Sequence, residues 1–183
     1  MLAGHFGVGL GLKARYTSVP LAPILLAAAL PDLLFVLLQA LGWESLAAPA
    51  AQPLHPGTFG SVPFSHDLSM AAIAAGLTAS LMLLLVSSRW ALALGIAVFS
   101  HVLLDVLVQP PVIGVGGPWL PIHVGLDLWR RARFLGWGAE MLVVLGGGWM
   151  YLRARQEVGP GRRRAWGAPV LLVAVQLASL VVR

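Results

Sequence analysis

A histidine and an aspartate, His101 and Asp105, stand four residues apart in an apolar stretch of this sequence. On a helix this spacing puts both side chains on one face, one turn apart. An imidazole nitrogen and a carboxylate oxygen so placed can reach one metal ion. Two other apolar stretches contain Asp32 and His66, which add an oxygen and a nitrogen. Mixed imidazole and carboxylate ligation suits zinc, manganese or iron, and three such ligands plus a water form a catalytic arrangement.

Other ionisable residues accompany this set. His5 lies in a short apolar N-terminal segment and is a candidate ligand of a second ion, with Asp105 as the bridge. Asp67, His123 and Glu140 are candidates for a catalytic base or for groups that orient the ligands. A metal ion in such a site lowers the pKa of a bound water and polarises a carbonyl or phosphoryl group.

Each of these residues also has a plainer interpretation. His101 and Asp105 can form a buried hydrogen-bonded pair that holds helices together. Asp32 follows Pro31, so it can belong to a helix kink or to a transport path, and His66 can cap a helix. His55 lies in a loop, and we expect no chemistry from it.

The composition indicates a membrane protein. Of 183 residues, 58% are hydrophobic and only 10% are charged, against about 25% charged residues in soluble domains. Several apolar runs reach about 18 to 23 residues, enough to cross roughly 30 Å of hydrocarbon. The absence of cysteine excludes disulfides and thiolate ligands. The net charge of +5 comes from basic clusters at the ends of apolar runs, a pattern of membrane orientation rather than of nucleic-acid binding.

We therefore predict an all-α fold, a polytopic transmembrane helix bundle that forms a single integral membrane domain over residues 1–183. It has about five spans and an N-terminal half-membrane helix over residues 2–12. No charged segment precedes the first apolar stretch, so we expect no cleavable signal peptide. The predicted spans cover residues 19–41, 66–87, 90–109, 134–151 and 166–182.

The basic residues predict the orientation. With Lys13 and Arg15 in the cytoplasm, Arg89 and the arginines of residues 153–164 also lie inside, whereas the arginines of residues 130–133 lie outside. At 1.5 Å per residue Asp32 and His101 then lie roughly 12 Å below the outer helix ends, and Asp105 and Glu140 roughly 6 to 9 Å below them. His66 lies at the outer end itself, so the separate segments place their polar side chains in one outer layer. We expect the inner (plasma) membrane, with the site toward its outer or periplasmic half.

Five short motifs carry a family resemblance. They are Gly4-His5-Phe6-Gly7, Pro31-Asp32, Ser65-His66, the Ser100-His101 to Asp105 segment, and Gly125-Leu126-Asp127-Leu128-Trp129, in this order along the chain. In this order the sequence resembles the membrane-bound metal-dependent hydrolases of bacteria and archaea, a family of inner-membrane-associated hydrolases. The order of His and Asp residues is also similar to that of zinc-dependent phospholipase C.

The resemblance implies a specific chemistry. It implies zinc ligation by Asp32, His66, His101 and Asp105, with His5 on a second ion. The expected function is therefore a membrane-embedded metal-dependent hydrolase of a lipid or phosphoester, with one or two zinc ions as cofactor and membrane lipids as partners. Two alternatives stay open: an ion- or proton-coupled carrier or channel that uses buried Asp and His, and a non-catalytic membrane scaffold.

Overall fold

The computed structural model describes residues 2–46, 59–156 and 165–181, and most of them are helical. His55 and Arg162 to Arg164 therefore lie outside the described residues. Two short antiparallel strand pairs, β1 with β2 and β3 with β4, occur in the loops. The all-α class is confirmed. The elements are α1 (Leu2–Arg15), α2 (Leu21–Ala28), α3 (Leu30–Ala40), β1 (Ser45–Leu46), β2 (Phe59–Ser61), α4 (Leu68–Leu85), α5 (Ser88–Val108), β3 (Ile113–Gly114), η1 (Gly117–Trp119), β4 (His123–Val124), α6 (Leu128–Arg131), α7 (Arg133–Gln156) and α9 (Gly167–Val181).

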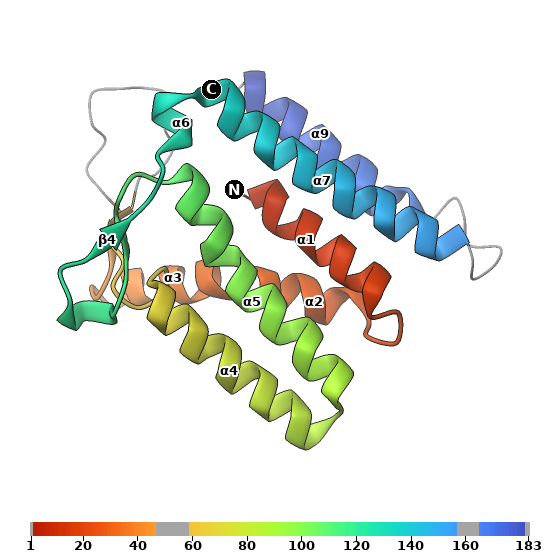
Figure 1. The fold of residues 1–183 in the computed structure, drawn as a ribbon, viewed down its shortest axis with the longest axis horizontal. Helices are drawn as coiled ribbons and strands as arrows, with labels where there is room; N and C mark the ends of the chain where they lie inside the picture. The colour runs from red at the N-terminus through yellow and green to blue at the C-terminus, as the bar shows by residue number, and fades with distance from the viewer. Residues whose placement is uncertain (1, 47–58, 157–164, 182–183) are drawn as a thin grey trace.

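Helix α5 lies at the centre of the arrangement. It packs against α4 on one side and against α1 and α2 on the other. Helix α1 also packs along α7, and α9 lies against α7 and α1, so that α1, α7 and α9 form one group of neighbouring helices (Figure 1). The segment α2–α3 crosses α5, and α2 packs against both α1 and α5.

Helices α4 and α5 are both apolar but differ in burial. In the most apolar part of α5, 56% of residues are buried, against 6% for α4. On α4, Leu77, Leu81 and Leu84 are exposed, Leu84 to 82%. Soluble monomers rarely expose contiguous apolar surface on this scale. An outer helix that is apolar all round is therefore suited to face lipid.

Within the part of the chain that the structure describes, two helices, α4 and α5, are long and apolar enough to cross a membrane. Helices α2 and α3 make a third candidate span if they are counted as one, although they meet at a bend of 48°. The expected count of about five spans is not supported. Helix α7 is long enough, but Glu140, its glycines and its terminal arginines lower its hydropathy. Helix α9 has only 15 residues, fewer than the roughly 20 that a span needs.

The predicted span over residues 19–41 divides at Ala29, which joins α2 to α3. Pro31 has no backbone N–H to donate to the carbonyl of Ala27, one turn earlier, and such a proline breaks or kinks a helix. The break places Asp32 in the first turn of α3. It also leaves the last carbonyls of α2 available to other donors.

Helices α1 and α7 approach each other through glycine. A Cβ on Gly147 would collide with the carbonyl oxygen of Gly7, and a Cβ on Gly7 would lie 2.9 Å from the carbonyl oxygen of Val143. Only glycine permits this backbone contact, the use that small residues have in helix pairs of membrane proteins. The contact fixes α1, and with it His5, against the rest of the bundle.

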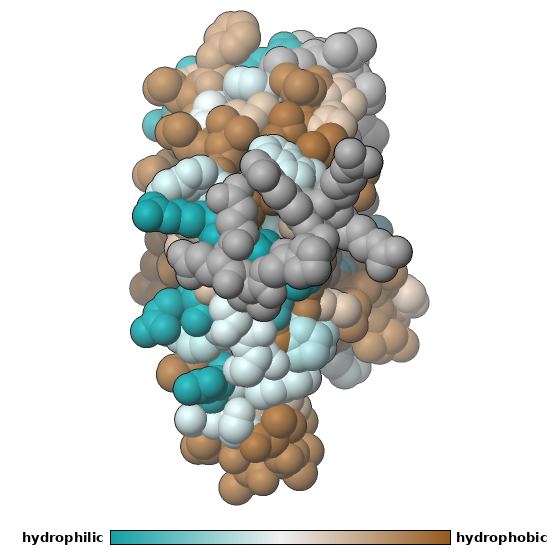
Figure 2. All heavy atoms as spheres, turned by 90° about the vertical axis from the view of Figure 1, so that its right-hand side faces the viewer, coloured by the Kyte–Doolittle hydropathy of each residue, from teal (hydrophilic) through white to brown (hydrophobic). Residues whose placement is uncertain are grey.

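Basic residues gather where α1 and α7 end. Lys13 and Arg15 lie in the last turn of α1, and Arg153 and Arg155 in the last turn of α7. Lys13 and Arg155 line one small cavity, so these two helix ends are adjacent. Figure 2 views the right-hand side of Figure 1, where a band of hydrophilic surface lies between hydrophobic surfaces.

Candidate metal centre

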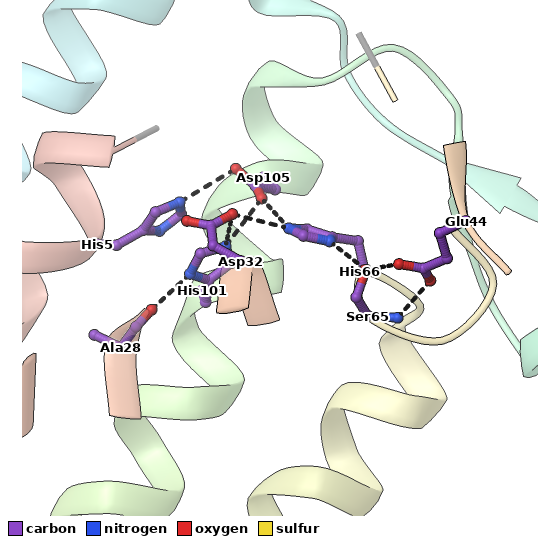
Figure 3. A network of polar contacts seen from close by, with 8 residues as sticks. All are labelled: His5, Ala28, Asp32, Glu44, Ser65, His66, His101 and Asp105. Carbon is purple, nitrogen blue, oxygen red and sulfur yellow. Dashed lines mark hydrogen bonds and ion pairs between the residues drawn. The ribbon is translucent and has the colours of Figure 1, made fainter. Parts of the chain in front are cut away.

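Five ionisable side chains from four parts of the chain converge at the centre of the molecule (Figure 3). His5 comes from α1, Asp32 from α3, His66 from the loop that enters α4, and His101 and Asp105 from α5. The Nε2 atom of His66 lies 3.5 Å from Asp32 Oδ1 and 3.5 Å from Asp105 Oδ2. The Nε2 atom of His101 lies 3.5 Å and 3.4 Å from the same two oxygens.

These separations are those of ligands around one ion. A hydrogen bond between nitrogen and oxygen is about 2.7 to 3.2 Å long, shorter than the four contacts. Two ligand atoms at about 2.1 Å from a tetrahedral zinc ion are roughly 3.4 Å apart. His101 Nε2 makes no hydrogen bond to the described residues although it is buried. Asp32, His66 and His101 thus have the atoms and spacing to hold a metal ion, and Asp105 belongs with His5 and His101 to a second group of potential ligands.

The orientation of His101 is set by the helix break. Its Nδ1 lies 2.6 Å from the carbonyl oxygen of Ala28, the last residue of α2. Because a carbonyl oxygen can only accept, Nδ1 carries a hydrogen, and in the neutral ring Nε2 then carries the lone pair. A second-shell acceptor of this kind is what fixes the tautomer of a metal-binding histidine. The break at Ala29 therefore both positions Asp32 and orients His101.

His66 is oriented by a serine and a glutamate. Its Nδ1 lies 2.8 Å from Ser65 Oγ, whose hydroxyl donates to Glu44 Oε2 at 2.5 Å. With its hydrogen given to Glu44, the hydroxyl accepts from His66 Nδ1, and the lone pair of Nε2 faces the two aspartates. Glu44 Oε1 also accepts the backbone N–H groups of Phe64 and Ser65, at 2.9 and 2.8 Å. The chain Glu44–Ser65–His66 is buried throughout.

His5 extends the cluster on the side of α1. Its Nε2 lies 3.4 Å from Asp105 Oδ1, the oxygen that does not face His66 and His101. Its ring stacks on that of His101, with centroids 3.6 Å apart and planes 14° apart. Two groups of potential ligands result, His5–His101–Asp105 and Asp32–His66–His101, which share His101. Asp105 presents one oxygen to each side, so a bridging role is geometrically available.

The cluster is closed on most sides. His5, His66, His101 and Asp105 are at most 3% exposed, whereas the side chain of Asp32 is 42% exposed. With its imidazoles neutral the cluster carries the two negative charges of its aspartates. Burial of such charges is costly unless they are paired or bind a cation. A divalent cation would balance that charge, and Asp32 marks the side on which the cluster is accessible.

The three residues predicted to be catalytic lie outside this cluster. Asp67 caps α4: its Oδ1 accepts the N–H groups of Ser69 and Met70 at 2.8 and 3.0 Å. Its Oδ2 accepts the N–H of Gly117 at 2.8 Å. The backbone of the loop between α5 and α6 is thereby attached to the start of α4. A catalytic role for Asp67 stays a prediction, and its contacts are those of a structural residue.

Glu140 lies between three helices. Its Oε1 accepts the N–H of Gly4 in the first turn of α1, at 3.3 Å, and its Oε2 accepts Gln176 Nε2 of α9, at 3.2 Å. A carboxylate beside the first turn satisfies one free N–H of that turn and interacts favourably with the helix dipole. Glu140 thus helps to hold the helix that carries His5, without being among the groups that surround the aspartates.

His123 differs from Asp67 and Glu140 because it is exposed. It lies on β4 opposite Gly114 of β3. With Pro63 and Trp119 it lines a cavity of about 540 Å³. A Cβ on Gly114 would meet the carboxylate of Asp67, so this hairpin packs directly beside the residue that follows His66.

Sequence reasoning missed Glu44 and Ser65 as parts of the site. Ser65 was noted only within a motif, and Glu44 is the single acidic residue of a loop rich in alanine, proline and glycine. An acidic residue in such a loop is a weak signal. Glu44 and Ser65 are 21 positions apart in the sequence, so the sequence does not reveal their contact.

Comparison of the chain with protein-family models, with curated proteins and with solved structures gave no match. The resemblance to membrane-bound metal-dependent hydrolases therefore stays an expectation from the motifs.

Proposed function

We propose that this protein is a membrane-embedded, metal-dependent hydrolase that acts on a phosphoester of a lipid. The observation that carries the proposal is the convergence of two imidazole Nε2 atoms and two carboxylate oxygens at 3.4 to 3.5 Å. Both imidazoles are oriented by an acceptor at Nδ1, which is the arrangement of metal-binding histidines.

Asp32, His66, His101 and Asp105 would hold the ion, and His5 with the second oxygen of Asp105 would add a second position. Zinc is the ion we propose, because two imidazoles with carboxylates are typical zinc ligands. When bound, a divalent ion lowers the pKa of a coordinated water and polarises a phosphoryl oxygen.

The chain's own residues complete the reaction. Hydrolysis puts the oxygen of water on phosphorus, breaks the ester P–O bond and leaves an alcohol that takes up a proton. We assign the transfer of that proton to His123, because it is the exposed histidine of the described residues and its hairpin packs beside Asp67. Asp32, through its partly exposed carboxylate, marks the side from which the phosphoester approaches.

The orientation that we propose puts the ends of α1 and α7 in the cytoplasm, where Lys13, Arg15, Arg153 and Arg155 gather. Lysine and arginine are enriched on that side of membranes. The His and Asp cluster then lies in the half of the plasma membrane that faces outward, because it is at the opposite end of α1 from Lys13 and Arg15.

The test is hydrolysis by protein purified in detergent, stripped of metal and then reloaded with zinc. A set of phospholipids is supplied, and the products are identified by mass spectrometry. We expect cleavage by the reloaded protein, none by the stripped protein and none by a His101→Ala variant. A His123→Ala variant should bind zinc normally while its kcat falls. Protein that binds zinc stoichiometrically but cleaves no phosphoester would contradict the proposal, and assays of ion transport in proteoliposomes would follow.

A further inference from the structure

An apolar groove lies beside the cluster. It has a volume of about 550 Å³, and every residue that lines it is alanine, leucine, valine or phenylalanine. Helix α1 contributes Ala3, Phe6 and Leu10, and the walls come from α2 and α9. Because α1 contacts both of these helices, the groove follows the surface of α1 between them.

One end of the groove is close to the cluster. Ala3 lies two residues before His5, and Ala29 lies three residues before Asp32. The other end is lined by Leu10, Ala22 and Ala168, toward the basic end of α1. From Ala3 to Leu10 the groove follows seven residues of helix, or about 10 Å.

We propose that this groove holds one acyl chain of the substrate, whose phosphoester lies at the His and Asp cluster. The inference rests on the proposed function and specifies its substrate class: a membrane phospholipid with a long chain, rather than a small water-soluble phosphoester. A groove without polar side chains excludes sugars, peptides and free phosphate from its length, since their polar groups would be buried without partners.

Two features favour an acyl chain of a substrate over lipid that merely surrounds the protein. The carboxylate of Asp32 is partly exposed, and the lining of the groove reaches Ala29, three residues before it. The direction of the groove also matches a lipid in the outer leaflet. In the proposed orientation the cluster lies in the outer half, and the groove leads from it toward the centre of the membrane, as a lipid chain does.

The matched variants lie on one helix. Ala168 of α9 is half-buried and lines the far end of the groove, whereas Ala174 of the same helix is exposed and does not line it. Ala168→Trp should fill the far end and shorten the space available to a chain. Ala174→Trp adds the same bulk to the same helix outside the groove, so it controls for effects on folding.

The experiment uses full-length protein in vesicles that contain a phosphatidylcholine with a photoreactive group at the end of one acyl chain. After illumination, the labelled residues are mapped by mass spectrometry, with zinc and after its removal. We expect label near Ala22 and Ala168 in the zinc-loaded protein, about a tenfold decrease in Ala168→Trp, and little change in Ala174→Trp. The hydrolysis rate of long-chain relative to short-chain phospholipid should fall in Ala168→Trp by a similar factor.

Three results would overturn the inference. Label that is equal in wild type and Ala168→Trp would show bulk lipid only. Label that depends on Ala168 but not on zinc would show a chain site without a phosphoester at the cluster. Equal hydrolysis of long-chain and short-chain substrates would show that the groove does not select the substrate. Failure of the proposed function itself is seen separately, as absence of bound zinc or of any hydrolysis.

Discussion

The acidic residues in and around the site fall into two regions that satisfy their charges differently. At the periphery of the site, Glu44, Asp67 and Glu140 accept hydrogen bonds from backbone N–H groups. At the centre, Asp32 and Asp105 face imidazole nitrogens at 3.4 to 3.5 Å. Carboxylates of the first kind hold segments of the chain together. Those of the second kind are arranged to share a cation with the imidazoles.

The comparison predicts that changes at the centre remove metal binding, whereas changes at the periphery mainly reduce stability. Glu44 is the intermediate case, because it accepts backbone N–H groups and also orients His66 through Ser65.

The largest effect is expected for His101→Ala. It removes one Nε2 ligand and leaves Asp32 and Asp105 with one imidazole fewer. Zinc affinity should fall by more than about a hundredfold, because loss of a second-shell partner alone costs 10- to 100-fold. Competition with a chromogenic chelator measures it. The matched control is His123→Ala, which should keep zinc affinity; an equal loss in both variants would place the ion elsewhere.

The second effect is expected for Glu44→Gln. The amide oxygen can still accept the N–H groups of Phe64 and Ser65, but the amide nitrogen cannot accept the Ser65 hydroxyl hydrogen. The orientation of His66 is then weakened, and zinc affinity should fall by about tenfold. The same chelator competition applies. Unchanged zinc affinity would show that Glu44 has only a structural role.

A third, smaller effect is expected for Glu140→Ala. The change leaves the N–H of Gly4 and the amide of Gln176 buried without their carboxylate partner. The free energy of unfolding should fall by about 1 to 3 kcal/mol, measured by denaturant unfolding in detergent. Zinc affinity should stay within about twofold of wild type. A loss as large as that of Glu44→Gln would show that Glu140 supports metal binding as well as stability, against the distinction made above.

The smallest effect is expected for Asp67→Asn. Its side-chain oxygen can still cap α4 through Ser69 and Met70, but the amide no longer accepts the N–H of Gly117. We expect a loss of about 1 kcal/mol in unfolding free energy and normal zinc affinity. If hydrolysis is lost at normal stability and zinc content, Asp67 is catalytic after all.

Much of the centre could be predicted from sequence because its ligands interrupt apolar stretches. His101 and Asp105 are one helical turn apart, and the depths of Asp32 and His66 placed them in the same layer. The structure brings these four residues and His5 together. The peripheral region could not be predicted in this way, since the contacts of Glu44 with Ser65 and of Glu140 with Gly4 join distant positions across loops and helices.

The number of membrane spans was harder to predict from the sequence than the residues of the cluster. Apolar length over residues 19–41 predicted one span, in which Pro31 was a possible kink, and the missing N–H of Pro31 divides it into α2 and α3. In α7 and α9, hydrophobic content predicted spans that hydropathy and length do not support. Hydrophobic content is averaged over a stretch of residues, so it does not reveal the local effect of a single proline or a buried glutamate.

The most direct test of the central claim is elemental analysis of detergent-purified protein prepared without chelators, comparing wild type with a His101→Ala, Asp105→Ala double variant. Bound zinc, or another divalent transition metal, close to one or two equivalents in wild type and absent from the variant is the predicted result. Wild-type protein that retains no metal, and whose thermal stability does not change when zinc, manganese or iron is added, would contradict the account and leave the cluster as a buried polar network.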